Sequence, residues 1–488
     1  MHHIALSVFV AVFLSACAAV GPDYQRPGIV TPENWRVDYP EAASVANIGW
    51  WTQFGDSALD ALIETALREN RDIQAAAARV DQFIGALQTT RSQFYPQIGY
   101  NANASRNRRT EHGPAPLPPG TDPYYSLYRG SLGASWQIDL FGRIRRQSEA
   151  AQAQVFVSEQ GRRGVILSVV TSVAASYIEL RALDRQLAIV RASAANYADT
   201  LGIFELRYQY GVVSQVELAQ AQSQYQLALS TIPAIEQQIV AQENLISILL
   251  GKNPESIPRG KTIDELIAPE VPPDLPSTLL ERRPDIVQAE QNLVAANANV
   301  GVARSFYYPT ITLTGLLGSA SLAFGNFLTG PASTWELAAG LAGPVLTFGA
   351  IEGQVKTAEA AQREALAFYQ ATILNAFRET NDALIGAVKK REEAKAKAMR
   401  AAALQDYARL SRLKFDNGYA DYIEVLYSEN ELFNAELVAV RSKAERYTEL
   451  VNVYKAMGGG WVDEAEMFSP KPRFTTVKPV SEESSPLR

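Results

Sequence analysis

The chain has 488 residues, with 45 lysines and arginines against 52 aspartates and glutamates, which gives a net charge of −7. This mild acidity argues against nucleic acid as a partner, because phosphate binding needs a concentrated basic surface. The mean hydropathy of −0.10 excludes a polytopic helical membrane protein, in which each span needs about 20 apolar residues. Of three histidines, His2 and His3 lie in a segment that is interpreted below as a removed leader, and there is one cysteine, Cys17. The remaining histidine, His112, lies in a Pro-rich loop and cannot by itself build a catalytic triad, a Cys-His pair or a zinc site, which need several converging groups. Chemistry by carboxylates alone stays open, but we expect no enzyme, no cofactor and no metal site.

The amino terminus is predicted to be a signal peptide, residues 1–16, with lipidation at Cys17. Residues 4–16 form a mostly apolar run that is too short to span a bilayer and is typical of a signal-peptide core. The run ends in Leu14-Ser15-Ala16-Cys17, which resembles the lipobox of bacterial lipoproteins, where the cysteine sulfur receives a diacylglycerol. An ordinary export signal with a chance cysteine is the alternative. Ala18, next in the chain, favours the outer membrane in the lipoprotein pattern.

The rest of the sequence is an internal two-fold repeat. Phe94-Tyr95-Pro96 recurs 213 residues later as Tyr307-Tyr308-Pro309, and Phe141-Gly142 recurs 207 residues later as Phe348-Gly349. The change of offset predicts a longer loop in the first half. We therefore predict an acylated segment at 17–56, a first repeat at 57–252, a Pro-rich linker at 253–277, a second repeat at 278–457 and a loose polar tail at 458–488.

Each repeat is predicted to contain a helix, two strands, a very long helix, a turn and a long helix. The first helix, over 57–95, has apolar residues seven apart, a spacing that imposes a left-handed supercoil. No proline occurs between Gly142 and Pro233. A helix from Arg143 to about Tyr208 would be about 100 Å long. At Pro233 we expect a kink.

Four stretches alternate apolar and polar residues: 97–105, 124–140, 310–317 and 335–345. Leu132, for example, lies on the apolar face and its neighbour Ser131 on the polar face. Transmembrane strands around a wet lumen and half-buried soluble strands alternate in the same way, and the lipid anchor favours the first interpretation. Open strand edges cannot face lipid, and the smallest transmembrane barrels have eight strands. The chain must therefore pool its strands with copies of itself.

Three motifs carry a family resemblance across nearly the whole chain: VGPDYQRP at 20–27, the run from Trp50 to Ile73, and ERRPDI at 281–286 followed by AANA at 295–298. They resemble the TolC-like outer-membrane factor family, in the lipoprotein branch that serves resistance-nodulation-division (RND) efflux pumps. The resemblance implies an α+β membrane protein, a trimer with a 12-stranded β-barrel built from four strands per chain. It also implies a long 12-helix periplasmic α-barrel and an equatorial belt.

The same resemblance implies the function and the partners. The chain would be the exit duct of a tripartite efflux pump, lipid-anchored in the outer membrane and extending into the periplasm. A periplasmic adaptor (membrane-fusion) protein and an inner-membrane RND transporter would be its partners. An exit duct for type I protein secretion has the same fold, and a passive porin would explain the strands but not the periplasmic hairpins. Drugs, dyes, solvents and metal ions all remain open as cargo.

Site residues are expected at the turns between the long helices, 208–214 and 415–421. Gly211 and Gly418 let the chain reverse with a positive φ. In the family these tips meet the adaptor and pinch the channel shut. The resemblance thus implies adaptor contacts and a gate at the following residues: for the adaptor Gly211, Val212, Ser214, Gly418 and Tyr419, and for the gate Asp421, Glu424, Tyr419, Tyr422 and Tyr427.

The acids at the tips have two interpretations. Glu217, Asp421 and Glu424 are either functional acids of the tips, with Asp421 and Glu424 forming a cation-selective carboxylate ring, or solvated charges favoured by a helix N-terminus. The second acid usual in the family is replaced by Tyr427, which leaves open whether the constriction is acidic or aromatic. A separate basic cluster, Arg106, Arg108 and Arg109, is expected on an outer loop, either solvated or in contact with anionic lipopolysaccharide.

Overall fold

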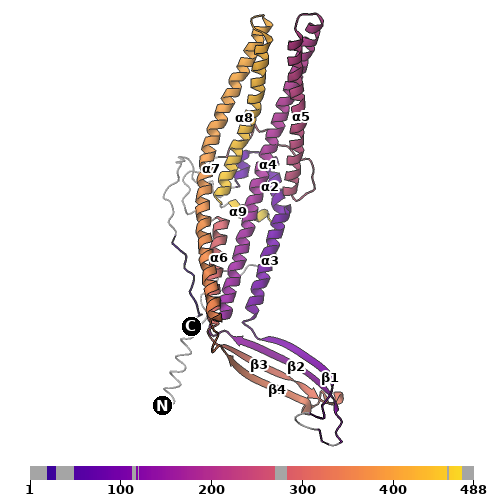
Figure 1. The fold of residues 1–488 in the computed structure, drawn as a ribbon, viewed down its shortest axis with the longest axis vertical. Helices are drawn as coiled ribbons and strands as arrows, with labels where there is room; N and C mark the ends of the chain where they lie inside the picture. The colour runs from indigo at the N-terminus through magenta and orange to yellow at the C-terminus, as the bar shows by residue number, and fades with distance from the viewer. Residues whose placement is uncertain are drawn as a thin grey trace.

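The structure is a computed structural model that describes residues 19–28, 49–112, 117–118, 120–269, 283–458 and 461–474. The molecule is elongated, with a bundle of long helices at one end and a twisted sheet at the other (Figure 1). The predicted signal peptide and Cys17 lie outside the described residues, as do residues 281 and 282 of the ERRPDI motif.

The two halves of the chain have the same element order and nearly the same element lengths. Helices α3 and α6 have 22 residues each, α4 and α7 have 67, and α5 and α8 have 35. The predicted order in each half is confirmed. The elements are η2 (Trp50–Phe54), α2 (Ser57–Glu69), α3 (Arg71–Ser92), β1 (Gln97–Arg108), β2 (Tyr124–Ile138), α4 (Arg143–Gln209), α5 (Gln215–Leu249), α6 (Pro284–Ser305), β3 (Thr310–Ser321), η4 (Phe324–Asn326), η5 (Gly330–Ala332), β4 (Ser333–Ala342), α7 (Ala350–Asp416), α8 (Tyr422–Ala456) and α9 (Trp461–Phe468).

The predicted single helix over 57–95 is wrong, because the chain breaks at Asn70. The Asn70 side chain accepts hydrogen bonds from the backbone N–H groups of Asp72 and Ile73, at 2.9 and 3.1 Å. Asparagine is a favoured N-cap, so it ends α2 and starts α3. Helix α5, by contrast, runs through Pro233, and the kink there stays a prediction.

The strands form one antiparallel sheet in the order β1-β2-β3-β4, with β1 and β4 at its edges. The predicted alternation is confirmed and continues across the sheet. One register row joins Tyr100, Leu132, Leu317 and Trp335, and the adjacent row joins Asn101, Ser131, Gly318 and Thr334. One face is therefore apolar and the other largely polar.

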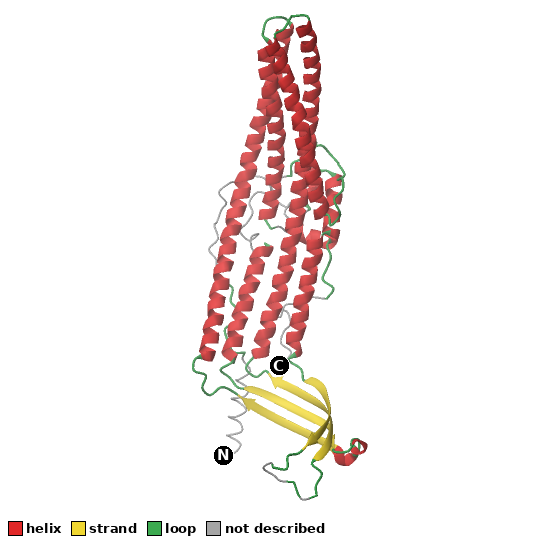
Figure 2. Ribbon diagram, turned by 45° about the vertical axis from the view of Figure 1, so that its right-hand side comes forward, coloured by secondary structure: helices red, strands yellow, loops and turns green. Residues whose placement is uncertain are grey.

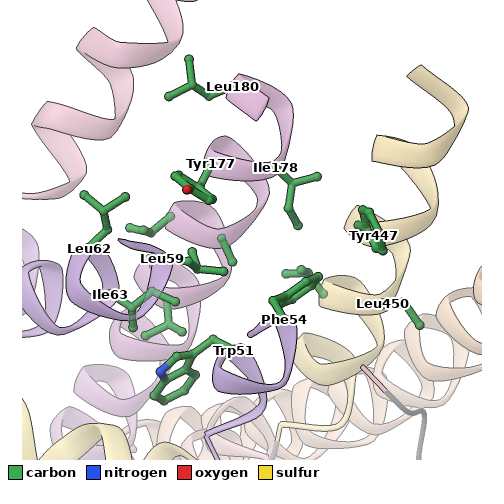
Figure 3. Packing of buried hydrophobic residues seen from close by; sticks show 14 of the residues in the cluster. Trp51, Phe54, Leu59, Leu62, Ile63, Tyr177, Ile178, Leu180, Tyr447 and Leu450 are labelled. Atoms are coloured by element: carbon green, nitrogen blue, oxygen red, sulfur yellow. The ribbon is translucent and has the colours of Figure 1, made fainter. Parts of the chain in front are cut away.

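The main core lies midway along the molecule (Figure 1), where residues of α2, α4 and α8 pack together (Figure 3). Phe54 is fully buried and its ring lies 5.8 Å from that of Tyr447, in an edge-to-face arrangement. Helix α4 contains a stretch apolar enough to cross a membrane, the only such helix among the described residues. Because 67% of that stretch is buried, it behaves as a core helix.

The expectation of a loose tail after Gly458 is wrong for residues 461–468, which form α9. Trp461 is buried against Trp50, with ring centroids 6.0 Å apart, and Glu466 pairs with Arg162 at 2.7 Å. The tail was predicted to be loose from its polar composition, and that composition does not reveal a contact between two tryptophans far apart in the sequence. The predicted linker is likewise packed over its described part, residues 253–269, with Ile257, Ile263 and Leu266 buried in the same core.

Candidate channel gate at the hairpin tips

The long helices form two hairpins, α4–α5 and α7–α8, whose turns lie at the end of the molecule opposite the sheet (Figure 1). Both turns have the same geometry. Gly211 and Gly418 have φ angles of 72° and 74°, a region that strains other residues. The next residue, Val212 or Tyr419, returns a backbone N–H at 2.8 Å to a carbonyl five positions earlier, a helix end of the Schellman type.

Glu217 at the first tip has a local structural role. Its carboxylate accepts from the Ser214 backbone N–H at 2.7 Å, while the Ser214 hydroxyl accepts from the Glu217 N–H at 3.3 Å. This reciprocal capping box satisfies two N–H groups at the start of α5. Of the two interpretations, the helix-start charge describes Glu217. Asp421 is the N-cap of α8, the position that Ser214 has on α5, but its side chain makes no capping hydrogen bond.

An aromatic cluster joins the two hairpins just behind the tips. The Tyr422 ring lies 4.1 Å from that of Phe204 on α4 and 5.3 Å from that of Phe415 on α7. The Arg207 guanidinium lies 5.6 Å from the Phe415 ring centroid, within cation–π range. Tyr422 is 2% exposed, and this burial raises the pKa of its hydroxyl. Tyr422 therefore packs inside the chain rather than facing open space.

The remaining predicted gate residues do not form one cluster. Tyr419 and Tyr427 are 85% and 61% exposed. Glu424 turns back toward α7, where its carboxylate lies 3.4 Å from the Lys414 ammonium and 3.4 Å from the Ser411 hydroxyl. Sequence reasoning missed Lys414, and it also missed Phe204 and Arg207; Phe415 lies in the predicted turn 415–421, but its contact with Tyr422 was not predicted. Their helical spacing toward the turns was the available signal.

A second polar contact lies between α7 and α8, farther from the tip. Arg412 lies 3.7 Å from Glu429, and burial raises the pKa of the Glu429 carboxyl although Arg412 lowers it. Tyr197 of α4 is buried beside Glu429, and burial together with the acids Glu429 and Glu436 raises the pKa of its hydroxyl. The hairpins are thus joined by aromatic packing and by partly desolvated acids.

The segment that follows Cys17 is fixed at the opposite end of the helices. The Arg146 guanidinium is nearly buried and donates to Asp23 at 2.6 Å and to the Gly21 carbonyl at 3.2 Å. The Val20 N–H donates to the Phe141 carbonyl, between β2 and α4, at 3.1 Å. Residues 20–23 therefore lie where the sheet joins the helices. Over the part of the chain that the structure describes, no three His, Cys, Asp or Glu side chains gather as metal ligands.

The model of the family "Outer membrane efflux protein" matches residues 62–252 and 275–459. The chain belongs to this family. Efflux-family relatives span almost its whole length. The probable outer membrane lipoprotein SilC of Salmonella typhimurium is 29% identical, covering 94% of this chain and 99% of SilC. The toluene efflux pump outer membrane protein TtgC of Pseudomonas putida is 30% identical, covering 94% of this chain and 96% of TtgC.

The fold agrees with a solved efflux channel. A crystal structure of CusC superposes with a TM-score of 0.81 at 28% identity, covering 91% of this chain and all of that one. The CusC of Escherichia coli is named as a cation efflux system protein. The resemblance drawn from the sequence is confirmed: this member of the efflux family is an outer-membrane channel protein that extends into the periplasm.

Proposed function

We propose that the chain is the exit duct of a tripartite efflux pump and acts as a homotrimer. The carrying observation is the sheet, whose apolar rows run across four strands and end in two open edges. Backbone groups at such edges cannot be left unpaired in lipid, so β4 of one copy would pair with β1 of the next. Three copies would close a 12-stranded barrel, continued by a 12-helix periplasmic barrel with an equatorial belt.

The internal repeat supports ring closure by copies of the same chain. Within one chain, Phe141 of the first half stacks on Tyr308 of the second, with ring centroids 4.7 Å apart. Their counterparts at the same offsets, Phe348 and Tyr95, are 90% and 70% exposed. If the second half of one copy meets the first half of the next in the same way, Phe348 would stack on Tyr95 of a neighbouring copy. In this proposal the repeats are 57–252 and 278–457.

At the tips, the partners would be a periplasmic adaptor and an inner-membrane RND transporter. The first tip exposes Tyr210 and Val212, and the second exposes Tyr419. Exposed apolar side chains on a turn with fixed backbone geometry suit recognition by another protein. Gly211, Ser214 and Gly418 would shape these turns for the adaptor.

The gate would combine the contacts that join the two hairpins, the aromatic cluster around Tyr422 and the polar contact at Glu429, with a ring of acids. Asp421 and Glu424 from three chains would place carboxylates around one axis, with Tyr419 and Tyr427 lining the constriction. Opening would require the aromatic packing around Tyr422 to loosen, since this packing joins α8 to α4. Lipidation at Cys17 would anchor the chain, because residues 20–23 are fixed where the sheet begins.

The cargo class follows from the relatives. One is named for toluene and another for cations, so small molecules or ions are proposed here. An exit duct for protein secretion is the second candidate. The identity of the partner protein captured at the tips distinguishes it from an efflux duct.

The experiment is photo-crosslinking in cells from a benzoylphenylalanine placed at Val212 or Tyr419, followed by mass spectrometry of the captured protein. A matched control places the probe at Ile248, which is exposed on α5 far from the tip. Capture of a periplasmic adaptor from the tips alone supports the proposal. Capture of an adaptor of a protein-secretion system, or equal capture from Ile248, would contradict it.

A further inference from the structure

The outer end of the sheet carries two arginines on its apolar face. The prediction that Arg106 and Arg108 lie in a loop is wrong, because β1 extends to residue 108. Their register partners on β2 are Ser126 and Tyr124. Alternate residues of a strand share a face, so both arginines share the face of Tyr100. The inference rests on the proposed function, in which that face contacts lipid.

The height of these arginines on the sheet can be estimated from Trp136. Its indole N–H donates to the Phe94 carbonyl at 2.8 Å, so Trp136 lies close to the end of the face nearest the helices, two residues before Ile138. From Trp136 to Ser126, the partner of Arg106, the strand advances about 33 Å. At a strand tilt of about 40° this is about 25 Å along the barrel axis, the height of the apolar band in outer-membrane barrels. Arg106 therefore lies at the level of the outer-leaflet headgroups.

Local contacts orient the two guanidinium groups without burying them. They lie 6.0 and 5.8 Å from the centroid of the Tyr124 ring, and Arg106 also donates to the Ser126 hydroxyl at 3.1 Å. Arg108 pairs with Glu111 at 2.9 Å, but both side chains are more than half exposed. Such an exposed pair contributes little, so it leaves Arg108 able to bind an anion.

An apolar loop covers the same face beside the arginines. Residues 322–332, between β3 and β4, contain no charged residue. Phe324 packs edge-to-face on Tyr128 at 5.4 Å, and Phe327 occupies the space that a Cβ on Gly130 would need. Leu322 and Leu328 stay exposed. The chain leaves β1 after Arg108 at the same end of the sheet at which the 322–332 loop leaves β3 (Figure 2).

We propose that Arg106 and Arg108, together with the 322–332 loop, bind the phosphorylated lipid of the outer leaflet. The guanidinium groups pair with the headgroup phosphates, for which their planar donor geometry is suited. The exposed leucines of the loop contact the acyl chains. Charge complementarity carries the choice of ligand: on a chain of net charge −7, two arginines lie where this leaflet presents anionic groups.

The test is a lipid titration of the purified full-length protein in detergent, followed by native mass spectrometry. The probes are diphosphoryl lipid A and the same lipid after removal of both phosphates. The variant is Arg106→Ala with Arg108→Ala. Arg129→Ala is the matched control, because Arg129 lies on the opposite face of β2, opposite Asn103. Each arginine near an anionic surface contributes about fivefold, so the double variant should bind the diphosphoryl lipid roughly 25-fold more weakly.

Support requires that Arg129→Ala stays within about twofold of the wild type and that the wild type prefers the phosphorylated lipid. Equal binding by the wild type and the double variant, or the absence of phosphate preference, overturns the inference. Bilayer conductance of the same samples separates the two proposals. Conducting protein without phosphate preference refutes only the lipid site, whereas phosphate-dependent binding by protein that never conducts refutes only the channel.

Discussion

Asn70 and Arg283 close the same junction in the two halves of the chain. Asn70 Nδ2 donates to the Leu249 carbonyl at 2.8 Å, and Arg283 Nη1 donates to the Ala456 carbonyl at 2.7 Å. Each residue directly precedes a 22-residue helix and satisfies a carbonyl at the end of a 35-residue helix. Different side chains thus preserve one tertiary contact.

Arg283→Met should destabilise the folded protein by about 1–3 kcal/mol, since the Ala456 carbonyl would lose a charged donor inside the protein. The partners Asp285 and Glu379 are nearly half exposed, so their loss adds little. Thermal unfolding followed by circular dichroism measures the effect. Arg378→Met is the matched control, because Arg378 is 62% exposed and pairs only at the surface. Equal melting temperatures for the two variants would contradict the junction.

Tyr422→Ala should raise the conductance of the purified protein in planar bilayers. The substitution removes a buried ring that joins α8 to Phe204 of α4, so the second hairpin would be freer to move. Tyr422→Phe keeps the ring and should behave like the wild type, and Phe204→Ala should reproduce the effect of Tyr422→Ala. A conductance change in Tyr422→Phe would instead assign the role to the hydroxyl.

Asp421→Ala combined with Glu424→Ala should weaken cation preference and block by divalent cations. Of the two, Asp421 should have the larger effect, because Lys414 already neutralises part of the Glu424 charge. Glu217→Ala should leave both properties unchanged, since that carboxylate caps its own helix. Reversal potentials in salt gradients decide this. If the paired substitution has no effect, the closure is aromatic.

Stability should fall with rising pH because of Glu429. Its carboxyl has a pKa raised above the usual 4.5 in the folded state, so the protonated form is favoured there. The contribution is fully present below the ordinary pKa and is lost as the pH rises through the raised value. Glu429→Gln should flatten the dependence of the melting temperature on pH above the ordinary carboxyl pKa of 4.5. Glu392→Gln, at an exposed site, should not change it.

The register of the contact between copies can be predicted from the contact within one chain. The hairpins β1–β2 and β3–β4 pair in the same register, with Gln97 opposite Ser135 and Thr310 opposite Ala342. Applying the β2–β3 register at the repeat offsets places Ala339 opposite Ala104 of a neighbouring copy.

Ala104→Cys with Ala339→Cys should therefore crosslink copies of the chain, and the acylated Cys17 would not compete. Covalent oligomers on a denaturing gel are the readout. Ala338→Cys in place of Ala339→Cys puts the thiols on opposite faces and should crosslink far less. Crosslinking with the control pair alone would mean that the sheet closes in a register shifted by one residue.

Periodic features of this protein could be predicted from the sequence, because they repeat. The strand faces follow from strict alternation, as at Leu132 and Ser131. The equal helix lengths follow from the offsets of 207 and 213. Gly211 and Gly418 indicated both turns, since few other residues adopt a positive φ.

The roles of single side chains could not be predicted from the sequence. Asn70 fits the heptad spacing of a continuous helix, and the break is explained by its capping of α3 together with its contact with Leu249. Tyr422 and Tyr419 both follow a turn glycine, but the first is buried against α4 and the second is exposed. Which of them faces the other hairpin depends on how the hairpins cross. The contact between Trp50 and Trp461 joins the two ends of the chain and follows no local period.

Helix α4 runs without interruption from Arg143 at the sheet to Gln209 at the tip. Arg146 holds the segment after Cys17 near one end, and Phe204 holds the aromatic cluster near the other. The helix is therefore a lever arm about 100 Å long, along which a tilt of about 5° at the base would displace the tip by roughly 9 Å. A small rigid tilt at the membrane would therefore shift the closing contacts at the tip by several ångströms, and no helix would have to unwind.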